Sequence, residues 1–314
     1  MDNNVNNINN KMKIHFIIPG GGVKGCFQAG FLYRLYKSYS DYFELYQIDG
    51  CSVGALNGLG VTSGNVLDLK DIWHNIKSST DIFSPLSKVP LINGIVTAYS
   101  VFYKNGVYKN KLKNIIDSYK INKDNELSKF NCVVSNIRTG IYQYINGTHP
   151  KIKDYTTASG TPWIISSPVE IDDNIYTDGA LLQLYPIKYI DDSKADKIVI
   201  VGYDEEHFYK YADEGDNVLY YLARIIDVCR NNNLNMKYIK KVINKDNVIL
   251  VDNPLKVDFL HFDPKIIKEG FKLGDMAATK FALQYFKFKK TNLETKKVNN
   301  KNNNKLERRN SFTY

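Results

Sequence analysis

The residues best suited to do chemistry lie in the segment Gly50-Cys51-Ser52-Val53-Gly54. An apolar run from Leu45 to Ile48 comes before them, and a stretch of small residues begins at Ala55. A strand, a sharp turn with Ser at its tip and then a helix predict a nucleophile elbow. Glycines allow the unusual backbone angles of such a turn, and the helix N-terminus favours negative charge that develops beside the Ser52 hydroxyl. The pattern predicts a serine nucleophile for acyl transfer, although G-x-S-x-G alone is a weak signal.

A glycine-rich loop is the second element, and it consists of Gly20, Gly21, Gly22, Val23, Lys24 and Gly25. It follows the apolar run Ile14 to Ile18 and leads into residues 24 to 38, whose apolar side chains recur at helical spacing. Backbone N–H groups of such a loop, together with a helix N-terminus, bind an oxyanion or a phosphate.

The same loop supports a second interpretation, because Gly20, Gly22 and Gly25 match the dinucleotide fingerprint G-x-G-x-x-G. Asp49, at the end of the next predicted strand, stands where a ribose-binding carboxylate is expected. This alternative does not explain why Ser52 and its flanking glycines follow directly after Asp49.

The third element is Asp178-Gly179-Ala180, which follows a predicted strand over Asn174 to Thr177. An Asp-Gly pair after a strand is usually only a turn. Its place after the glycine-rich loop and the Ser52 elbow makes Asp178 a candidate catalytic base.

These three elements, in this order, resemble the patatin-like phospholipase family. A fourth segment, Ala158-Ser159-Gly160-Thr161-Pro162, is similar to the family's Ala-Ser segment before the Asp, and Leu181 to Pro186 resembles the apolar stretch after it. The resemblance covers roughly residues 13 to 202.

The resemblance implies a lipid acyl hydrolase of the phospholipase A or lysophospholipase type, which cleaves carboxylic esters through an acyl-enzyme. Ser52 would be the nucleophile and Asp178 the general base. The oxyanion hole would come from backbone N–H groups of Gly21 and Gly22, with Gly20 and Val23 as further candidates. The motif is completed by residues that shape the loops: Lys24, Gly25, Gly50, Gly54, Gly179 and Ala180.

A Ser-His-Asp esterase of another class remains an alternative, because His207 or His261 could be the third member. The dyad is preferred, since an ionised carboxylate can accept the serine proton directly and both histidines have ordinary explanations as surface or core residues. No cofactor and no metal are expected.

The net charge of +9 is unevenly distributed along the 314 residues. Residues 287 to 314 carry nine Lys or Arg against two Glu, so the rest of the chain is nearly neutral. We therefore expect a disordered N-terminus (1–12), one catalytic domain (13–286) and a basic, Asn- and Lys-rich, disordered tail (287–314).

A phospholipid or another acyl lipid is the expected partner, and the tail is a candidate for peripheral contact with anionic membranes. No nucleic-acid partner is expected, because no basic-aromatic motif accompanies the charges. Cysteine spacing suggests neither disulfides nor zinc, and no apolar run is long enough to span a bilayer, so we expect a cytoplasmic protein.

Strand patterns that alternate with helical patterns predict an α/β fold of three layers, with a mostly parallel central sheet and helices on both faces.

Overall fold

The computed structural model describes residues 11–85, 108–122, 124–162, 166–203, 234–259 and 261–288. The histidine at position 207 and most of the basic tail lie outside these ranges.

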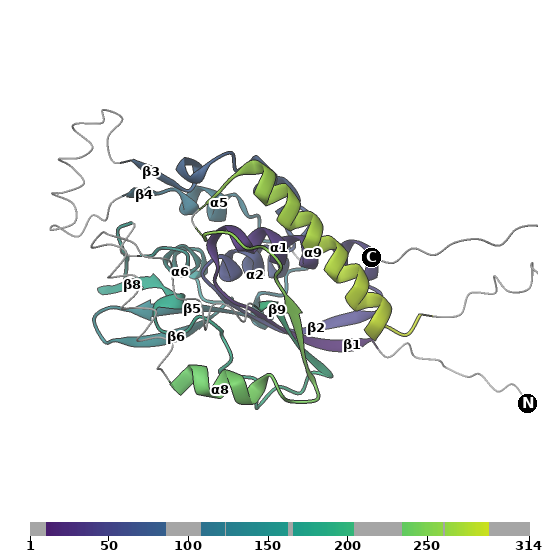
Figure 1. Ribbon diagram of the computed structural model, residues 1–314. Coiled ribbons are helices and arrows are strands. Elements are labelled where there is room, and N and C mark those ends of the chain that lie inside the picture. Colours follow the sequence, from purple (N-terminus) through teal and green to yellow (C-terminus); the bar gives the residue numbers. More distant parts are fainter. Residues whose placement is uncertain are drawn as a thin grey trace, which may run out of the picture.

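A sheet of eight strands forms the centre of the molecule, in the order β10-β9-β1-β2-β5-β8-β7, with β6 paired to β5 (Figure 1). Its strands are β1 (Met12–Ile18), β2 (Phe43–Cys51), β5 (Phe130–Asn136), β6 (Ile141–Asn146), β7 (Val169–Ile171), β8 (Asn174–Asp178), β9 (Lys197–Tyr203) and β10 (Val248–Asp252). Strands β10, β9, β1, β2 and β5 pair in parallel, whereas β6 and β8 run antiparallel to β5. A separate pair is formed by β3 (Phe83–Pro85) and β4 (Tyr108–Asn110).

Helices cover both faces of the sheet (Figure 1). The thicker layer contains α1 (Gly25–Tyr39), α2 (Val53–Thr62), α3 (Leu69–Asn75), α5 (Leu112–Ser118), α6 (Ile152–Ser159) and α9 (Pro264–Tyr285). The opposite face carries α8 (Leu234–Val242). Short 3-10 turns lie at η1 (Gly22–Lys24), η2 (Ser79–Asp81), η3 (Leu127–Lys129) and η4 (Gly179–Leu181).

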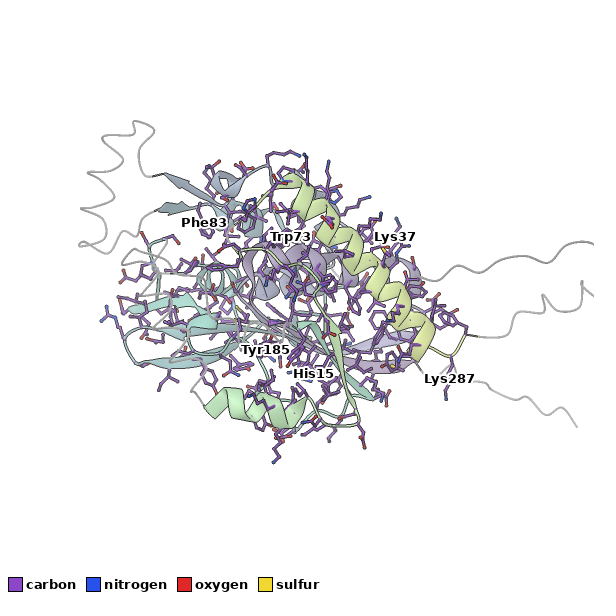
Figure 2. The ribbon with its side chains drawn as sticks, viewed as in Figure 1. His15, Lys37, Trp73, Phe83, Tyr185 and Lys287 are labelled. Atoms are coloured by element: carbon purple, nitrogen blue, oxygen red, sulfur yellow. The ribbon has the colours of Figure 1, made fainter. Side chains whose placement is uncertain are left out.

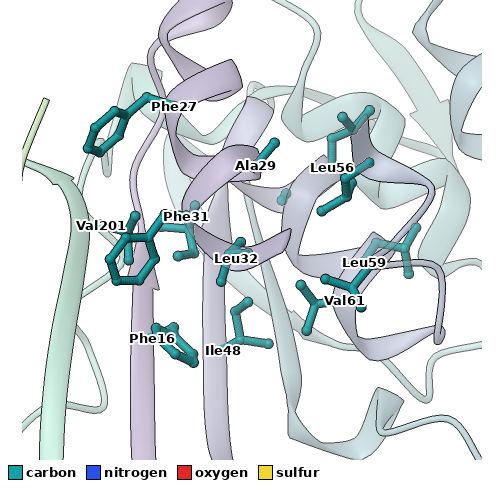
Figure 3. Packing of buried hydrophobic residues seen from close by; sticks show 14 of the residues in the cluster. Phe16, Phe27, Ala29, Phe31, Leu32, Ile48, Leu56, Leu59, Val61 and Val201 are labelled. Atoms are coloured by element: carbon teal, nitrogen blue, oxygen red, sulfur yellow. The ribbon is translucent and has the colours of Figure 1, made fainter. Parts of the chain in front are cut away.

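Successive side chains of β1 point to opposite faces of the sheet, so this one strand contributes to two hydrophobic cores. Ile14, Phe16 and Ile18 point into the cluster beneath α1, whereas Ile17 belongs to the smaller cluster beside α8. Figure 3 shows Phe16 and Ile48 of the sheet packed against Phe31 and Leu32 of α1. Figure 2 shows the same division, with Trp73 on the α9 side of the sheet and Tyr185 on the α8 side.

Helix α9 holds α1 in place at the outer edge of the thicker layer. Asp263 caps its N-terminus by accepting hydrogen bonds from the amides of Lys265 and Ile266, and Pro264 occupies the first turn. Gly30 and Gly274 bring the two helices together: a Cβ atom at Gly30 would lie 2.0 Å from the carbonyl oxygen of Phe271. Because α1 begins at the glycine-rich loop, α9 also supports that loop.

The predicted α/β fold with a mostly parallel sheet is confirmed. Two details differ from the sequence-based expectation. Strand β2 continues past Asp49 to Cys51, because residues 48–51 pair with β5. Helix α6 was not expected, since the polar sequence between Ile152 and Ser159 hides its apolar face.

Candidate active site

Ser52 occupies a strained turn between β2 and α2. Its φ of 54° and ψ of −128° place a non-glycine residue in a sparsely populated backbone region, which costs about 1–3 kcal/mol. The cost is offset by anchoring, because the Ser52 amide donates to Oγ of Ser159 at 2.8 Å and the Ser52 carbonyl accepts from Ala55 at 2.9 Å. Gly50 lies at the end of β2, and Gly54 lies in the first turn of α2. The turn therefore directs the hydroxyl away from the strand, at the N-terminus of a helix.

The Asp178 carboxylate meets the Ser52 hydroxyl across 126 positions of sequence. Oγ of Ser52 donates a hydrogen bond of 2.7 Å to Oδ2 of Asp178. The other carboxylate oxygen, Oδ1, accepts from the backbone N–H of Ala180 at 2.8 Å, so η4 fixes the orientation of the carboxylate. Gly179 begins that turn. The serine side chain is 9% exposed, which keeps most of this contact away from water.

The glycine-rich loop lies beside both residues. A Cβ atom at Gly20 would be 3.0 Å from Cβ of Ser52 and 3.3 Å from Cβ of Ala180. The three elements singled out in the sequence therefore converge at the carboxyl ends of β1, β2 and β8.

Of the four backbone amides expected as oxyanion donors, two already donate hydrogen bonds to other backbone carbonyls. The Gly20 amide donates to the Leu184 carbonyl at 3.3 Å, and the Val23 amide donates to the Phe259 carbonyl at 2.8 Å. Within the described residues, the amides of Gly21 and Gly22 donate no backbone hydrogen bond. The loop thus presents Gly21 and Gly22 as its two available donors, whereas the amides of Gly20 and Val23, also expected as candidate donors, donate elsewhere.

The segment Ala158-Ser159-Gly160-Thr161-Pro162 has a structural role that sequence reasoning did not identify. Ser159, completely buried, accepts from the Ser52 amide and donates to the Val133 carbonyl at 2.6 Å. The Thr161 carbonyl accepts from the Asp178 amide at 2.9 Å. One segment at the end of α6 therefore positions both members of the candidate dyad. A small hydroxyl residue three positions before a Pro was the available signal.

Replacing Ser159 with Ala should lower the free energy of unfolding by about 1–3 kcal/mol, because it leaves the Ser52 amide and the Val133 carbonyl without their partner. Ester hydrolysis should fall as well, since the strained turn at Ser52 loses its anchor. Denaturant unfolding and steady-state kinetics measure the two effects. Ser166→Ala is the matched control, because the Ser166 hydroxyl is buried and lacks a hydrogen-bond partner within the described structure. Equal effects of both substitutions would contradict the anchoring role.

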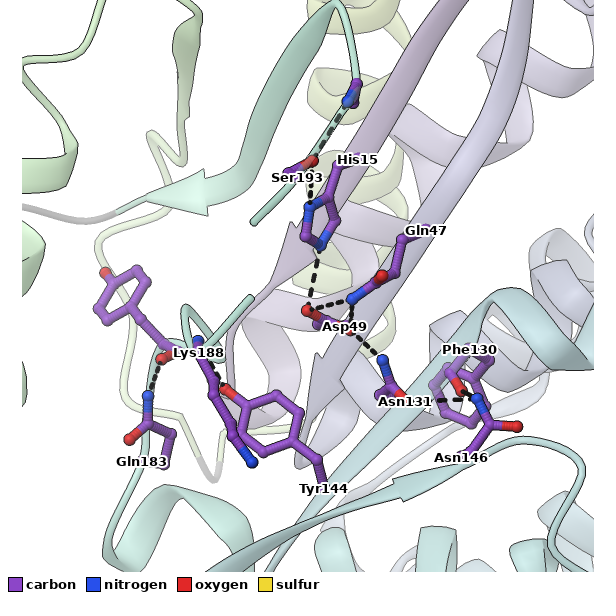
Figure 4. Close-up of polar contacts among 12 residues, drawn as sticks. His15, Gln47, Asp49, Phe130, Asn131, Tyr144, Asn146, Gln183, Lys188 and Ser193 are labelled. Atoms are coloured by element: carbon purple, nitrogen blue, oxygen red, sulfur yellow. Dashed lines mark hydrogen bonds and ion pairs between the residues drawn. The ribbon is translucent and has the colours of Figure 1, made fainter. Parts of the chain in front are cut away.

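Asp49, which the dinucleotide interpretation required, lies in a network of hydrogen bonds between side chains of β1, β2 and β5 (Figure 4). Its side chain is fully buried and accepts hydrogen bonds from Gln47 and from Asn131 at 2.8 Å. It also contacts Nε2 of His15 at 3.0 Å, and Nδ1 of His15 contacts Ser193. A carboxylate enclosed in this way cannot reach a ribose hydroxyl.

Histidines and cysteines of the described structure do not complete a different catalytic set at Ser52. No histidine in the described ranges is hydrogen-bonded to the Ser52 side chain, and His261 is exposed. Burial raises the pKa of the Cys132 thiol to about 12, which keeps it protonated at neutral pH and therefore a poor nucleophile. Within the same ranges, His, Cys, Asp and Glu side chains form no group of three or more that could hold a metal ion.

A family model covers the segments that form this candidate site. The patatin model, described as patatin-like phospholipase, matches residues 16–191, more than half of the chain. The chain therefore belongs to the patatin-like phospholipase family.

Other comparisons add little detail. Among solved structures, the crystal structure of VipD from Legionella pneumophila is similar, with 13% identity and a TM-score of 0.38. That match covers 85% of this chain and 67% of VipD. No curated protein sequence matches the chain.

Proposed function

We propose that this protein is a lipid acyl hydrolase of the phospholipase A or lysophospholipase type, with Ser52 as nucleophile and Asp178 as general base. The observation that carries the proposal is the 2.7 Å hydrogen bond from the Ser52 hydroxyl to the Asp178 carboxylate. A base at this distance can take the serine proton directly, so no histidine is needed. Family membership supports an acyl lipid as the substrate class.

The first half-reaction forms an acyl-enzyme. Oγ of Ser52 attacks the ester carbonyl carbon while its proton moves to Oδ2 of Asp178. The carbonyl oxygen becomes an oxyanion, which the amides of Gly21 and Gly22 stabilise; one such donor is worth about 2.7–4 kcal/mol. The tetrahedral intermediate then collapses, and the departing alkoxide of the lysolipid takes the proton from Asp178.

The second half-reaction releases the fatty acid. Asp178, again ionised, accepts a proton from a water molecule that attacks the acyl carbonyl, and the same two amides stabilise the second oxyanion. Collapse breaks the bond to Oγ, which recovers its proton from Asp178. The Ala180 amide holds the carboxylate through Oδ1 throughout, so Oδ2 alone carries the proton between serine, leaving group and water.

Fatty-acid release from phosphatidylcholine and lysophosphatidylcholine in mixed micelles tests the proposed activity, with a short-chain p-nitrophenyl ester as a soluble reference. We expect free fatty acid from a phospholipid substrate, at a rate proportional to enzyme. Hydrolysis of the soluble ester with no release from any phospholipid would argue against the lipid substrate. Failure to cleave every ester would contradict the proposal as a whole.

We also propose that residues 13–286 form the catalytic unit and that the basic tail contacts anionic lipid. None of the helices in the described ranges has the length and hydropathy needed to cross a bilayer, and each Lys or Arg close to an anionic surface adds roughly 1 kcal/mol. Sedimentation of the inactive Ser52→Ala protein with vesicles should show stronger binding to phosphatidylserine than to phosphatidylcholine, and weaker binding at high salt. Equal binding to the two lipids would exclude an electrostatic tail contact.

A further inference from the structure

The segment that joins β10 to α9 runs along the glycine-rich loop and lies outside the residues that match the family. It begins at Asn253, a residue that is 5% exposed. The backbone N–H of Asn253 donates to the Tyr203 carbonyl at the end of β9. Oδ1 of Asn253 accepts from the Leu255 amide at 3.0 Å, which sets the turn of the chain toward the loop. The start of the segment is therefore tied to the sheet.

Hydrogen bonds to backbone carbonyls connect this segment to the loop. Nδ2 of Asn253 donates to the Lys24 carbonyl at 3.3 Å. The Phe259 carbonyl accepts from the Val23 amide at 2.8 Å. These contacts hold the C-terminal side of the loop, whereas the bond from Gly20 to Leu184 holds its N-terminal side.

Gly22 shows how closely the segment approaches. Its φ is +56°, a left-handed conformation, and a Cβ atom there would lie 2.1 Å from the carbonyl oxygen of Phe259. The carbonyl therefore fills the space beside Gly22 on one side. The peptide between Gly22 and Val23 is fixed at the same point, so the neighbouring amides have little freedom to rotate.

We propose that residues 253–259 act as a brace that positions the Gly21 and Gly22 amides to receive the oxyanion. The inference rests on the proposed function, and it assigns positioning residues to a part of the chain beyond the family match. Positioning matters because misplacement of about 1 Å can lower a rate by about 100-fold. Loss of the brace should weaken binding of the transition state more than binding of the substrate.

Asn253→Asp tests the brace with little change in shape. Aspartate keeps the acceptor for the Leu255 amide, but it cannot donate to the Lys24 carbonyl and instead repels that oxygen. We expect kcat on a soluble ester to fall at least about tenfold while KM changes less than about twofold. A trifluoromethyl ketone, which forms a tetrahedral oxyanion on Ser52, should bind weaker by the same factor as kcat/KM falls.

Asn65→Asp is the matched control. Asn65 is 7% exposed and donates through Nδ2 to the Lys120 carbonyl at 2.6 Å, at the opposite end of α2 from Ser52. This variant should lose stability without losing kcat or affinity for the ketone. Equal kinetic losses in both variants would show a general effect of stability and overturn the brace.

Wild-type kcat and ketone affinity in Asn253→Asp would also overturn it. If Asn253→Asp does not fold, Asn253→Ala removes both side-chain bonds without adding a charge, and the same kinetic split is expected. Failure of the proposed function can be told apart from failure of the brace. If the proposed function is wrong, Ser52→Ala will retain full ester hydrolysis, with or without a substitution at residue 253.

Discussion

Replacing Ser52 with Ala is expected to reduce ester hydrolysis by about a million-fold, to a rate near background. The reason is that the substitution removes the atom that would attack the carbonyl, while the glycine-rich loop and Asp178 remain in place. Steady-state assays with a soluble ester and with a phospholipid should show the same loss. The loss should also appear in single-turnover experiments, because no acyl-enzyme can form.

Ser63→Ala provides the control for this variant. Ser63 is a fully buried serine at the other end of α2, and its hydroxyl donates to the Leu59 carbonyl at 2.6 Å. It should retain its catalytic rate, although it loses stability because the hydroxyl donates to Leu59 and also accepts from Nδ2 of Asn65 at 2.8 Å. Ester hydrolysis by Ser52→Ala at more than a small fraction of the wild-type rate would mean that another group is the nucleophile.

Replacing Asp178 with Asn is expected to lower kcat by about 10³- to 10⁴-fold. The single amide oxygen of Asn can accept from the Ser52 hydroxyl or from the Ala180 N–H, but not from both, and the amide cannot take the serine proton. The effect should therefore fall on kcat, with KM changed little. Pre-steady-state measurements should show that formation of the acyl-enzyme is slow.

The histidine variants His261→Ala and His207→Ala complete this test, because they separate the dyad from a Ser-His-Asp triad. Both should retain wild-type kcat. A large loss in either one, combined with substantial activity in Asp178→Asn, would favour the triad. His261 is exposed in the structure, which agrees with the expected result.

The candidate site could be predicted because its elements, each a weak signal alone, occur together and in a fixed order along the chain. Ser52 lies between an apolar strand and a helix of small residues, and Asp178 follows a short strand and precedes a glycine. The parallel-sheet rule brings the glycine-rich loop and Ser52 together, because β1 and β2 are parallel neighbours. Asp178 ends β8, which runs antiparallel to β5, so its place beside Ser52 was implied by the family resemblance and not by strand order; the structure supplies the 2.7 Å contact.

The supporting contacts could not be predicted, because they depend on pairings between distant backbone groups. Ser159 stands 107 positions from Ser52, and its role depends on where α6 ends. The Val23 amide donates to the main-chain carbonyl of residue 259, and any residue type at that position would supply this carbonyl. The Phe259 contact leaves no mark in composition or spacing, whereas Ser159 is marked by its place three positions before Pro162. The antiparallel pairing of β8 with β5 likewise joins segments that are distant in sequence.

The most direct test of the account is to locate the adduct of a fluorophosphonate probe by mass spectrometry of the digested protein. The probe phosphonylates a serine that has an active base and an oxyanion hole, and fluoride leaves. The account predicts one phosphonate per chain, on the peptide that contains Ser52, with slow labelling in Asp178→Asn. An adduct at any other residue, or labelling that persists in Ser52→Ala, would contradict it.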